Sequence, residues 1–168
     1  MNTRAAGAPW HPDCYSHSHN MKTHLSTISG ADTRASSGQP RVLHIDDRPE
    51  VTSLVERALQ RRGGCQLRSL NDANVAVTEA LQFMPDIVIL DVVMPDCDGG
   101  DVAAQLRDCP PLSNVPVIYF SSVFTLEEAK AQNARGGRNA YVSKSTGLGM
   151  LLARLETMID DVLITRRR

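Results

Sequence analysis

From Arg41 onward, short apolar runs alternate with segments in which apolar residues recur every three or four positions. A short apolar run fits a strand in a buried sheet, and the longer spacing fits a helix with one buried face. The expected strands are 42–45, 65–70, 87–90, 117–120 and 140–143. A helical segment follows each of them: between Pro49 and Gly63, between Asp72 and Pro85, around 102–106, at 126–134 and at 148–163.

This alternation predicts βα units around a parallel sheet. The run 87–90 is apolar throughout, as in a strand buried on both faces, whereas 65–70 alternates like an edge strand. Because crossover connections are right-handed, the fold class is an open, doubly wound five-stranded parallel α/β sheet with helices on both faces. Its ligand crevice is expected at the carboxyl ends of the strands, near the topological switch point.

The composition is that of a globular protein. The chain has 168 residues, 42% hydrophobic and 22% charged, with a formal net charge of -1, so neither nucleic acid nor a membrane is an expected partner. No apolar run approaches the ~20 residues of a membrane span, and we expect a cytoplasmic protein. The four cysteines have neither metal-site nor disulfide-framework spacing and are interpreted as free thiols.

The chain divides into three expected parts. Residues 1–40 are rich in small and polar residues without apolar periodicity, which predicts a disordered arm. Residues 41–163 form the folded domain, and 164–168 form a basic tail.

Three acidic residues follow two of the predicted strands. Asp46 and Asp47 come directly after the first strand, and Asp91 comes directly after the third. Crowded carboxylates repel one another unless a cation lies among them, and Mg²⁺ prefers oxygen ligands. A carboxylate at such a site can also be a nucleophile toward a phosphoryl group. The alternative is that these residues only cap helices and open turns, which Asp often does.

The fourth and fifth predicted strands also end in polar residues. Ser121 closes the fourth strand and Lys144 closes the fifth. An ammonium group can pair with phosphoryl oxygens, and a hydroxyl can donate to another. Taken singly, either residue could be ordinary surface.

At this point the sequence resembles the receiver domain of two-component response regulators, particularly the single-domain chemotaxis-regulator-like type, over residues 41 to about 163. The resemblance rests on four motifs in order: Val42–Asp47, Asp86–Gly99, Pro116–Ser122 and Tyr141–Lys144. It implies a flavodoxin-like sheet with strand order 2-1-3-4-5 and a receiver domain at 41–163.

The resemblance also implies roles for individual residues. Asp91 would accept a phosphoryl group from a sensor histidine kinase or a histidine phosphotransfer protein. Asp47, Asp91 and the backbone carbonyl of Val93 would bind Mg²⁺, with Asp46 acting mainly through bound water. Ser121 and Lys144 would contact the phosphoryl group. Tyr141 would be the switch aromatic, and the surface of helix four, strand five and helix five would meet a downstream protein target, although Tyr141 could equally just pack the sheet edge.

The sequence departs from the family pattern near the site. Ser145 follows Lys144 where the family usually has proline, which leaves the geometry of that loop open. Val93 and Val123 stand where many relatives carry polar side chains, which predicts slow loss of the phosphoryl group.

The leading prediction is a stand-alone response regulator that catalyses only its own phosphorylation and dephosphorylation, so it is not a conventional enzyme. One alternative is a Mg²⁺-dependent phosphatase or phosphotransferase with Asp91 as nucleophile, but Val93 stands where such enzymes have an acid-base Asp. The other is a degenerate receiver that binds partners without phosphorylation. The kinase, the target and the oligomeric state are left open.

Overall fold

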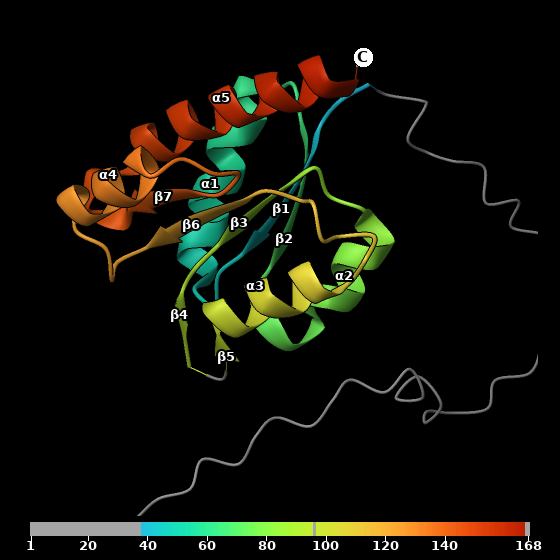
Figure 1. Cartoon of the computed structure of the whole chain (residues 1–168), viewed down its shortest axis with the longest axis horizontal. Coiled ribbons are helices and arrows are strands. Elements are labelled where there is room, and N and C mark those ends of the chain that lie inside the picture. Colours follow the sequence, from blue (N-terminus) through green and yellow to red (C-terminus); the bar gives the residue numbers. More distant parts are fainter. Residues whose placement is uncertain (1–37, 96, 167–168) are drawn as a thin grey trace, which may run out of the picture. The chain divides into compact units, whose positions relative to one another are not determined.

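The computed structural model describes residues 38–95 and 97–166, so nearly all of the expected arm at 1–40 lies outside the described residues. Five parallel strands form one sheet in the order β2-β1-β3-β6-β7 (Figure 1). They are Arg41–Ile45 (β1), Gln66–Leu70 (β2), Ile87–Leu90 (β3), Val117–Ser121 (β6) and Ala140–Ser143 (β7). The predicted fold class and strand order are confirmed.

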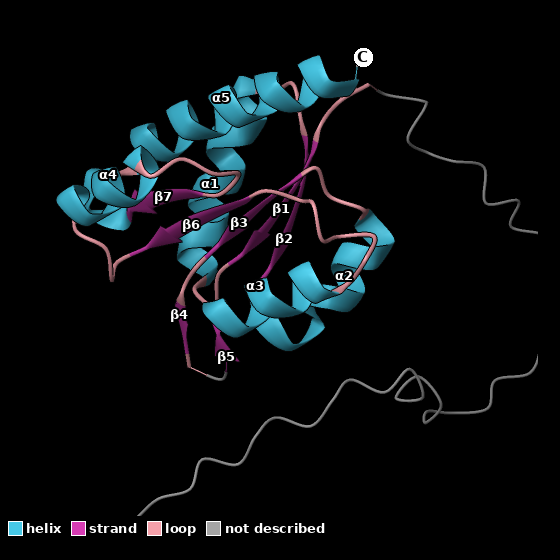
Figure 2. Cartoon of the chain, in the orientation of Figure 1, coloured by secondary structure: helices cyan, strands magenta, loops and turns pink. Residues whose placement is uncertain are grey.

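Helices cover both faces of this sheet (Figure 2). They are Pro49–Arg62 (α1), Ala76–Phe83 (α2), Gly99–Asp108 (α3), Leu126–Ala134 (α4) and Leu148–Arg166 (α5). Residues of α1 and α5 pack on one side of the strands, and residues of α2 and α3 pack on the other. Both faces of the central strands are therefore buried, which explains the uninterrupted apolar run of β3.

Local signals in the sequence account for several element ends. Pro49 occupies the first turn of α1, and Gly63 takes a positive φ of 70° directly after it. The Asp72 side chain accepts a hydrogen bond from the backbone N–H of Asn74, in a 3₁₀ turn that leads into α2. Helix α2 ends before Pro85, because Met84 is left-handed with a φ of 50°.

Three features extend beyond the predicted elements. Val93–Met94 (β4) pairs antiparallel with Cys97–Asp98 (β5) in a small hairpin. A 3₁₀ turn at Lys144–Thr146 joins β7 to α5. Helix α5 runs to Arg166, through the first three residues assigned to the basic tail. Two-residue strands and single turns are too short to show a period, so pattern analysis does not detect them.

The predictions about free cysteines and membrane spans can be compared with the structure only for the described residues. Cys65, Cys97 and Cys109 are free thiols, and Cys14 lies outside the described residues. Among the helices of 38–95 and 97–166, none has both the length and the apolar character needed to cross a bilayer.

Candidate functional site

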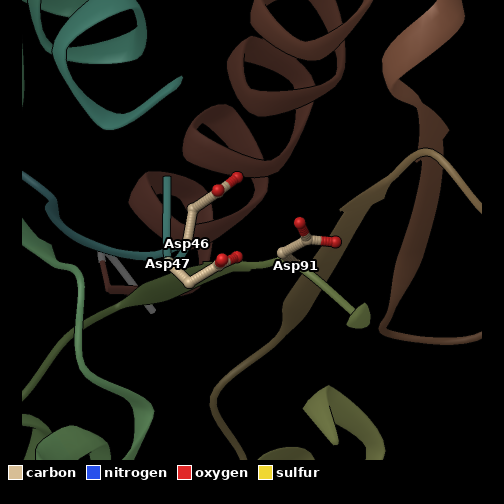
Figure 3. Close-up of side chains that lie close together, drawn as sticks. All are labelled: Asp46, Asp47 and Asp91. Carbon is tan, nitrogen blue, oxygen red and sulfur yellow. The ribbon is translucent and has the colours of Figure 1, made fainter. Parts of the chain in front are cut away.

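The expected site residues come together at the carboxyl ends of β1 and β3. The Asp91 N–H donates to the carbonyl of Ile45 at 2.9 Å, so the residue after β3 lies beside the end of β1. One carboxylate oxygen from each of Asp46, Asp47 and Asp91 lies within 4.8 Å of the others. Figure 3 shows these three side chains gathered at this edge of the sheet. The topological argument therefore located the cluster.

Asp46 is fully buried and held on several sides. Lys144 Nζ lies 2.5 Å from its Oδ2, and the backbone N–H of Arg48 donates to its Oδ1 at 3.1 Å. The Asn71 side chain donates to the Asp46 carbonyl at 2.7 Å, which joins the end of β1 to the loop after β2. Burial raises the pKa of Asp46 above its usual value, although the bond from Lys144 opposes that effect.

Asp91 has both carboxylate oxygens engaged and is only 3% exposed. Ser121 Oγ donates to Oδ1 at 2.7 Å, and the backbone N–H of Val93 donates to the same oxygen at 3.2 Å. Lys144 Nζ lies 2.5 Å from Oδ2. Burial, the largest single influence, raises the pKa of Asp91, but the bonds from Lys144, Ser121 and Val93 together lower it below the usual value.

Lys144 bridges the two buried aspartates from the end of β7. Its side chain is 10% exposed, and its Nζ lies 5.6 Å from the centre of the Phe120 ring. The loop that carries it is secured by hydroxyl groups: Ser143 Oγ accepts from the Ser145 N–H and lies 2.8 Å from Ser145 Oγ. All described peptide bonds are trans. The ammonium thus reaches both carboxylates with serine in place of the usual proline.

Close backbone packing fixes the segment after Asp91. The Gly99 N–H donates to the Val92 carbonyl at 2.8 Å. A Cβ on Gly99 would overlap the Asp91 carbonyl oxygen, so this position requires glycine. Gly99 ends a motif already noted in the sequence, but its contact with the Asp91 backbone could not be inferred from pattern alone.

The expected switch residue Tyr141 lies apart from the carboxylates. Its ring stacks on Tyr119, with centroids 5.0 Å apart, and meets Phe124 edge-on at 5.5 Å. None of its hydrogen bonds or ring contacts in the described residues involves the acid cluster. Ser121, by contrast, is fully buried and bonded to Asp91.

His44, in the predicted first strand, is fully buried in the core. Neither ring nitrogen, however, has a hydrogen-bond partner among the described residues, and the same holds for Ser69 Oγ on the neighbouring strand. Burial, helped by the charge on Lys144, lowers the pKa of His44 to about 3, so the ring is neutral near pH 7. The sequence predicts a buried position for His44 in a strand, but it does not reveal whether the ring nitrogens have hydrogen-bond partners.

The donor set suits a hard divalent cation. Carboxylate oxygens are the ligands that Mg²⁺ prefers, and the three aspartates bring them together at the mouth of the sheet. Lys144 contacts both Asp46 and Asp91, and the half-exposed Arg48 side chain lies 3.7 Å from Asp46, while no ion pair to Asp47 is present within the described residues. The arrangement can therefore hold a metal ion beside a buried, ionised carboxylate.

Comparison with known proteins agrees with this geometry. The family model described as the response regulator receiver domain matches residues 42–156. The chain belongs to the response regulator receiver family. A relative named "Probable transcriptional regulatory protein TcrX", from Mycobacterium tuberculosis, is 33% identical over 79% of this chain and 55% of its own length. The transcriptional regulatory protein PrrA of Mycobacterium leprae is 33% identical over 76% of this chain and 52% of its own.

The receiver chain thus spans about half the length of these curated relatives.

Solved structures show the same fold. The response regulator TrrA from Thermotoga maritima, in complex with Mg²⁺-BeF, has a TM-score of 0.58 at 22% identity, covering 71% of this chain and 99% of that one. The chemotaxis protein CheY4 of Vibrio cholerae has a TM-score of 0.60 at 22% identity, covering 71% and 98%.

Proposed function

We propose that this receiver accepts a phosphoryl group on Asp91 from a phosphohistidine of a sensor kinase or a histidine phosphotransfer protein. The observation that carries the proposal is the pairing at Asp91: its Oδ1 accepts from Ser121, and its Oδ2 contacts Lys144. A hydroxyl and an ammonium group therefore already contact the Asp91 carboxylate, and both could pair with the oxygens of a transferred group. The lowered pKa of Asp91 keeps this carboxylate ionised and nucleophilic.

Asp46, Asp47, Asp91 and the backbone carbonyl of Val93 are the groups that would hold Mg²⁺, which when bound neutralises charge on the phosphoryl oxygens. In the transfer, an Asp91 carboxylate oxygen forms the new bond to phosphorus. The bond between phosphorus and the imidazole nitrogen breaks, and its electron pair stays on the histidine. Lys144 and Ser121 then exchange carboxylate oxygens for phosphoryl oxygens.

The change of hydrogen-bond partner at Ser121 would link phosphorylation to the surface of the protein. Ser121 ends β6, and the loop that follows leads through Phe124 into α4. Phe124 also contacts the ring of Tyr141 on β7. A displacement of Ser121 toward the phosphoryl group would therefore alter the surface of α4, β7 and α5, which we propose as the contact for a downstream protein.

Intact mass spectrometry after incubation with acetyl phosphate and Mg²⁺ tests this function. We expect one phosphoryl adduct on the parent and none on Asp91→Asn. Asp108→Asn, which changes an exposed carboxyl on α3, is the matched control and should retain the adduct. If the parent gains no adduct, the phosphorylation-independent binding module becomes the better interpretation.

The structure favours a phosphoacceptor over a turnover phosphatase. A phosphatase of this chemistry needs an acid-base group next to its nucleophile. The residue two positions after Asp91 is Val93, whose side chain is 56% exposed and cannot transfer a proton. The family to which the chain belongs consists of response regulator receivers rather than metabolic enzymes.

A further inference from the structure

Helix α4 lies alongside β7 but buries little of its own surface. Of its nine residues, Ala129 is the one that is buried. Its first turn is held locally by a capping box, in which the Thr125 N–H donates to Glu128 and the Glu128 N–H donates to Thr125 Oγ1. These bonds stabilise the helix itself but do not attach it to the sheet.

One side chain supplies the hydrogen bonds between α4 and the sheet. Asn133 Nδ2 donates to the Tyr141 carbonyl at 2.8 Å, and Asn133 Oδ1 accepts from the Tyr141 N–H at 2.9 Å. Strand β7 lies at the edge of the sheet, so these backbone groups face away from β6. Within the described residues, Asn133 is the side chain of α4 that hydrogen-bonds to a strand. Its amide completes the edge of β7 as a neighbouring strand would.

The other end of α4 is connected to the acid cluster. Phe124, next to the N-cap of α4, packs edge-on against Tyr141. Ser143 Oγ donates to the Phe124 carbonyl at 2.5 Å. The segment from Ser121 to Phe124 is therefore held between Asp91 at its start and β7 at its end.

We propose that Asn133 is a positioning residue that fastens α4 to β7 and so favours the unphosphorylated conformation. This inference rests on the proposed function of Asp91 and adds the element that opposes the switch. A movement of Ser121 toward a phosphoryl oxygen would displace the loop between β6 and α4 and, with it, the first turn of α4. The two hydrogen bonds from Asn133 to Tyr141 would oppose a movement of the last turn of α4. Because Ala129 is the one buried residue of α4, the two bonds of Asn133 oppose a shift of the helix along β7.

Thermodynamic linkage turns this proposal into a measurement. A change that weakens the resting conformation must strengthen the binding of any ligand that prefers the other one, by the same factor. Mg²⁺ with beryllofluoride serves as the probe, because it mimics a phosphoryl group without transferring one. Asn133→Ala removes both bonds and improves helix propensity, so it tests the attachment rather than the helix.

Backbone amide NMR during a beryllofluoride titration gives the comparison. Asn133→Ala should bind the probe about fivefold more tightly or better than the parent, and its Tyr141 amide should exchange with solvent faster. Gln132→Ala, on the same helix, should match the parent in both respects. Asn133→Asp keeps the acceptor for the Tyr141 N–H but sets a carboxylate oxygen against the Tyr141 carbonyl, so it should also bind the probe more tightly than the parent.

The possible failures are distinct. If the parent binds beryllofluoride and Asn133→Ala binds it equally well, Asn133 is merely structural and the inference is wrong. If the parent does not bind the probe at all, the proposed function of Asp91 fails first, and the inference fails with it. Faster exchange at Tyr141 without a change in affinity also contradicts the inference, because it shows that the bonds break without affecting the switch.

Discussion

His44 lies one pleat below Asp46 on the same side of β1, because alternate residues of a strand share a face. The charged groups that act on it are Lys144 and Asp91, and its register neighbours are Ser69 on β2 and Ile89 on β3. A neutral, unpartnered imidazole in this position costs stability that a leucine of similar size would not.

Lowering the pH should increase the loss of stability caused by His44. The folded-state pKa of His44 is about 3, against an ordinary value of 6.5, so only the unfolded chain takes up the proton between these values. The stability contributed by the neutral ring is complete above pH 6.5 and is lost as the pH falls toward 3. Between about pH 7.5 and about pH 5, the parent should lose about 2 kcal/mol more unfolding free energy than His44→Leu. Urea unfolding in EDTA measures this difference, and equal pH slopes for the two proteins would contradict it.

Val93 comes two residues after Asp91, the proposed phosphoacceptor, and Val123 comes two residues after Ser121; both valines are exposed, at 56% and 50%. Neither valine has a polar side-chain atom that could orient a water molecule for attack on an aspartyl phosphate at Asp91. The phosphorylated protein should therefore last for minutes or longer in Mg²⁺ buffer, and Val93→Asn should shorten the half-life roughly tenfold by orienting water. Ile164→Asn, at a 54% exposed residue in the last turn of α5, is the control. A half-life of seconds for the parent would show the prediction to be wrong.

At the scale of elements, the sequence predicted what has a period or a strong end signal. The strands of the main sheet and all five helices produce runs long enough to recognise. Hairpin β4–β5 and the left-handed Met84 do not, because two paired residues or one backbone angle depend on tertiary contacts. The attachment of α4 by Asn133 was equally invisible, since a single polar residue gives no sign of its partner.

Gly99 connects two elements, because it begins α3 while it packs against the backbone after β3. Gly99→Ala would force the Asp91 carbonyl to move and should lower the unfolding free energy by about 2 kcal/mol. It should also slow phosphorylation by acetyl phosphate, since Asp91 would be misplaced. Gly100→Ala is the matched control, because a Cβ there meets only the Asp98 side chain. Equal losses of stability in the two variants, measured by urea unfolding, would exclude the proposed overlap.

At the scale of the whole molecule, the site follows from topology more than from any single residue. Asp46, Asp91 and Lys144 each follow a parallel strand directly, Ser121 ends one, and parallel strands end at one edge of the sheet. The sequence could therefore predict which side chains meet. It could not predict the bonds among them, such as the bridge from Lys144 to two aspartates, because these depend on loop conformations with no sequence period.

The three aspartates at the carboxyl edge of the sheet suit metal binding but repel one another, which lowers the stability of the metal-free protein. Asp46 and Asp91 share Lys144, whereas no salt bridge to Asp47 is present within the described residues. Asp47 therefore adds repulsion to the metal-free fold, and Asp47→Asn should raise its unfolding free energy by as much as about 1 kcal/mol. Urea unfolding in EDTA measures this gain.

Mg²⁺ should reverse the order of the two proteins. At a Mg²⁺ concentration about ten times the dissociation constant, the parent should gain about 1.4 kcal/mol through binding to the folded state. Asp47→Asn should gain much less, since it lacks one of the three carboxylates that bring their oxygens together. Repeating the unfolding in Mg²⁺, with Ca²⁺-free buffers, gives the comparison. If Mg²⁺ stabilised the variant as much as the parent, Asp47 would not be a ligand, and the metal would have to bind without it.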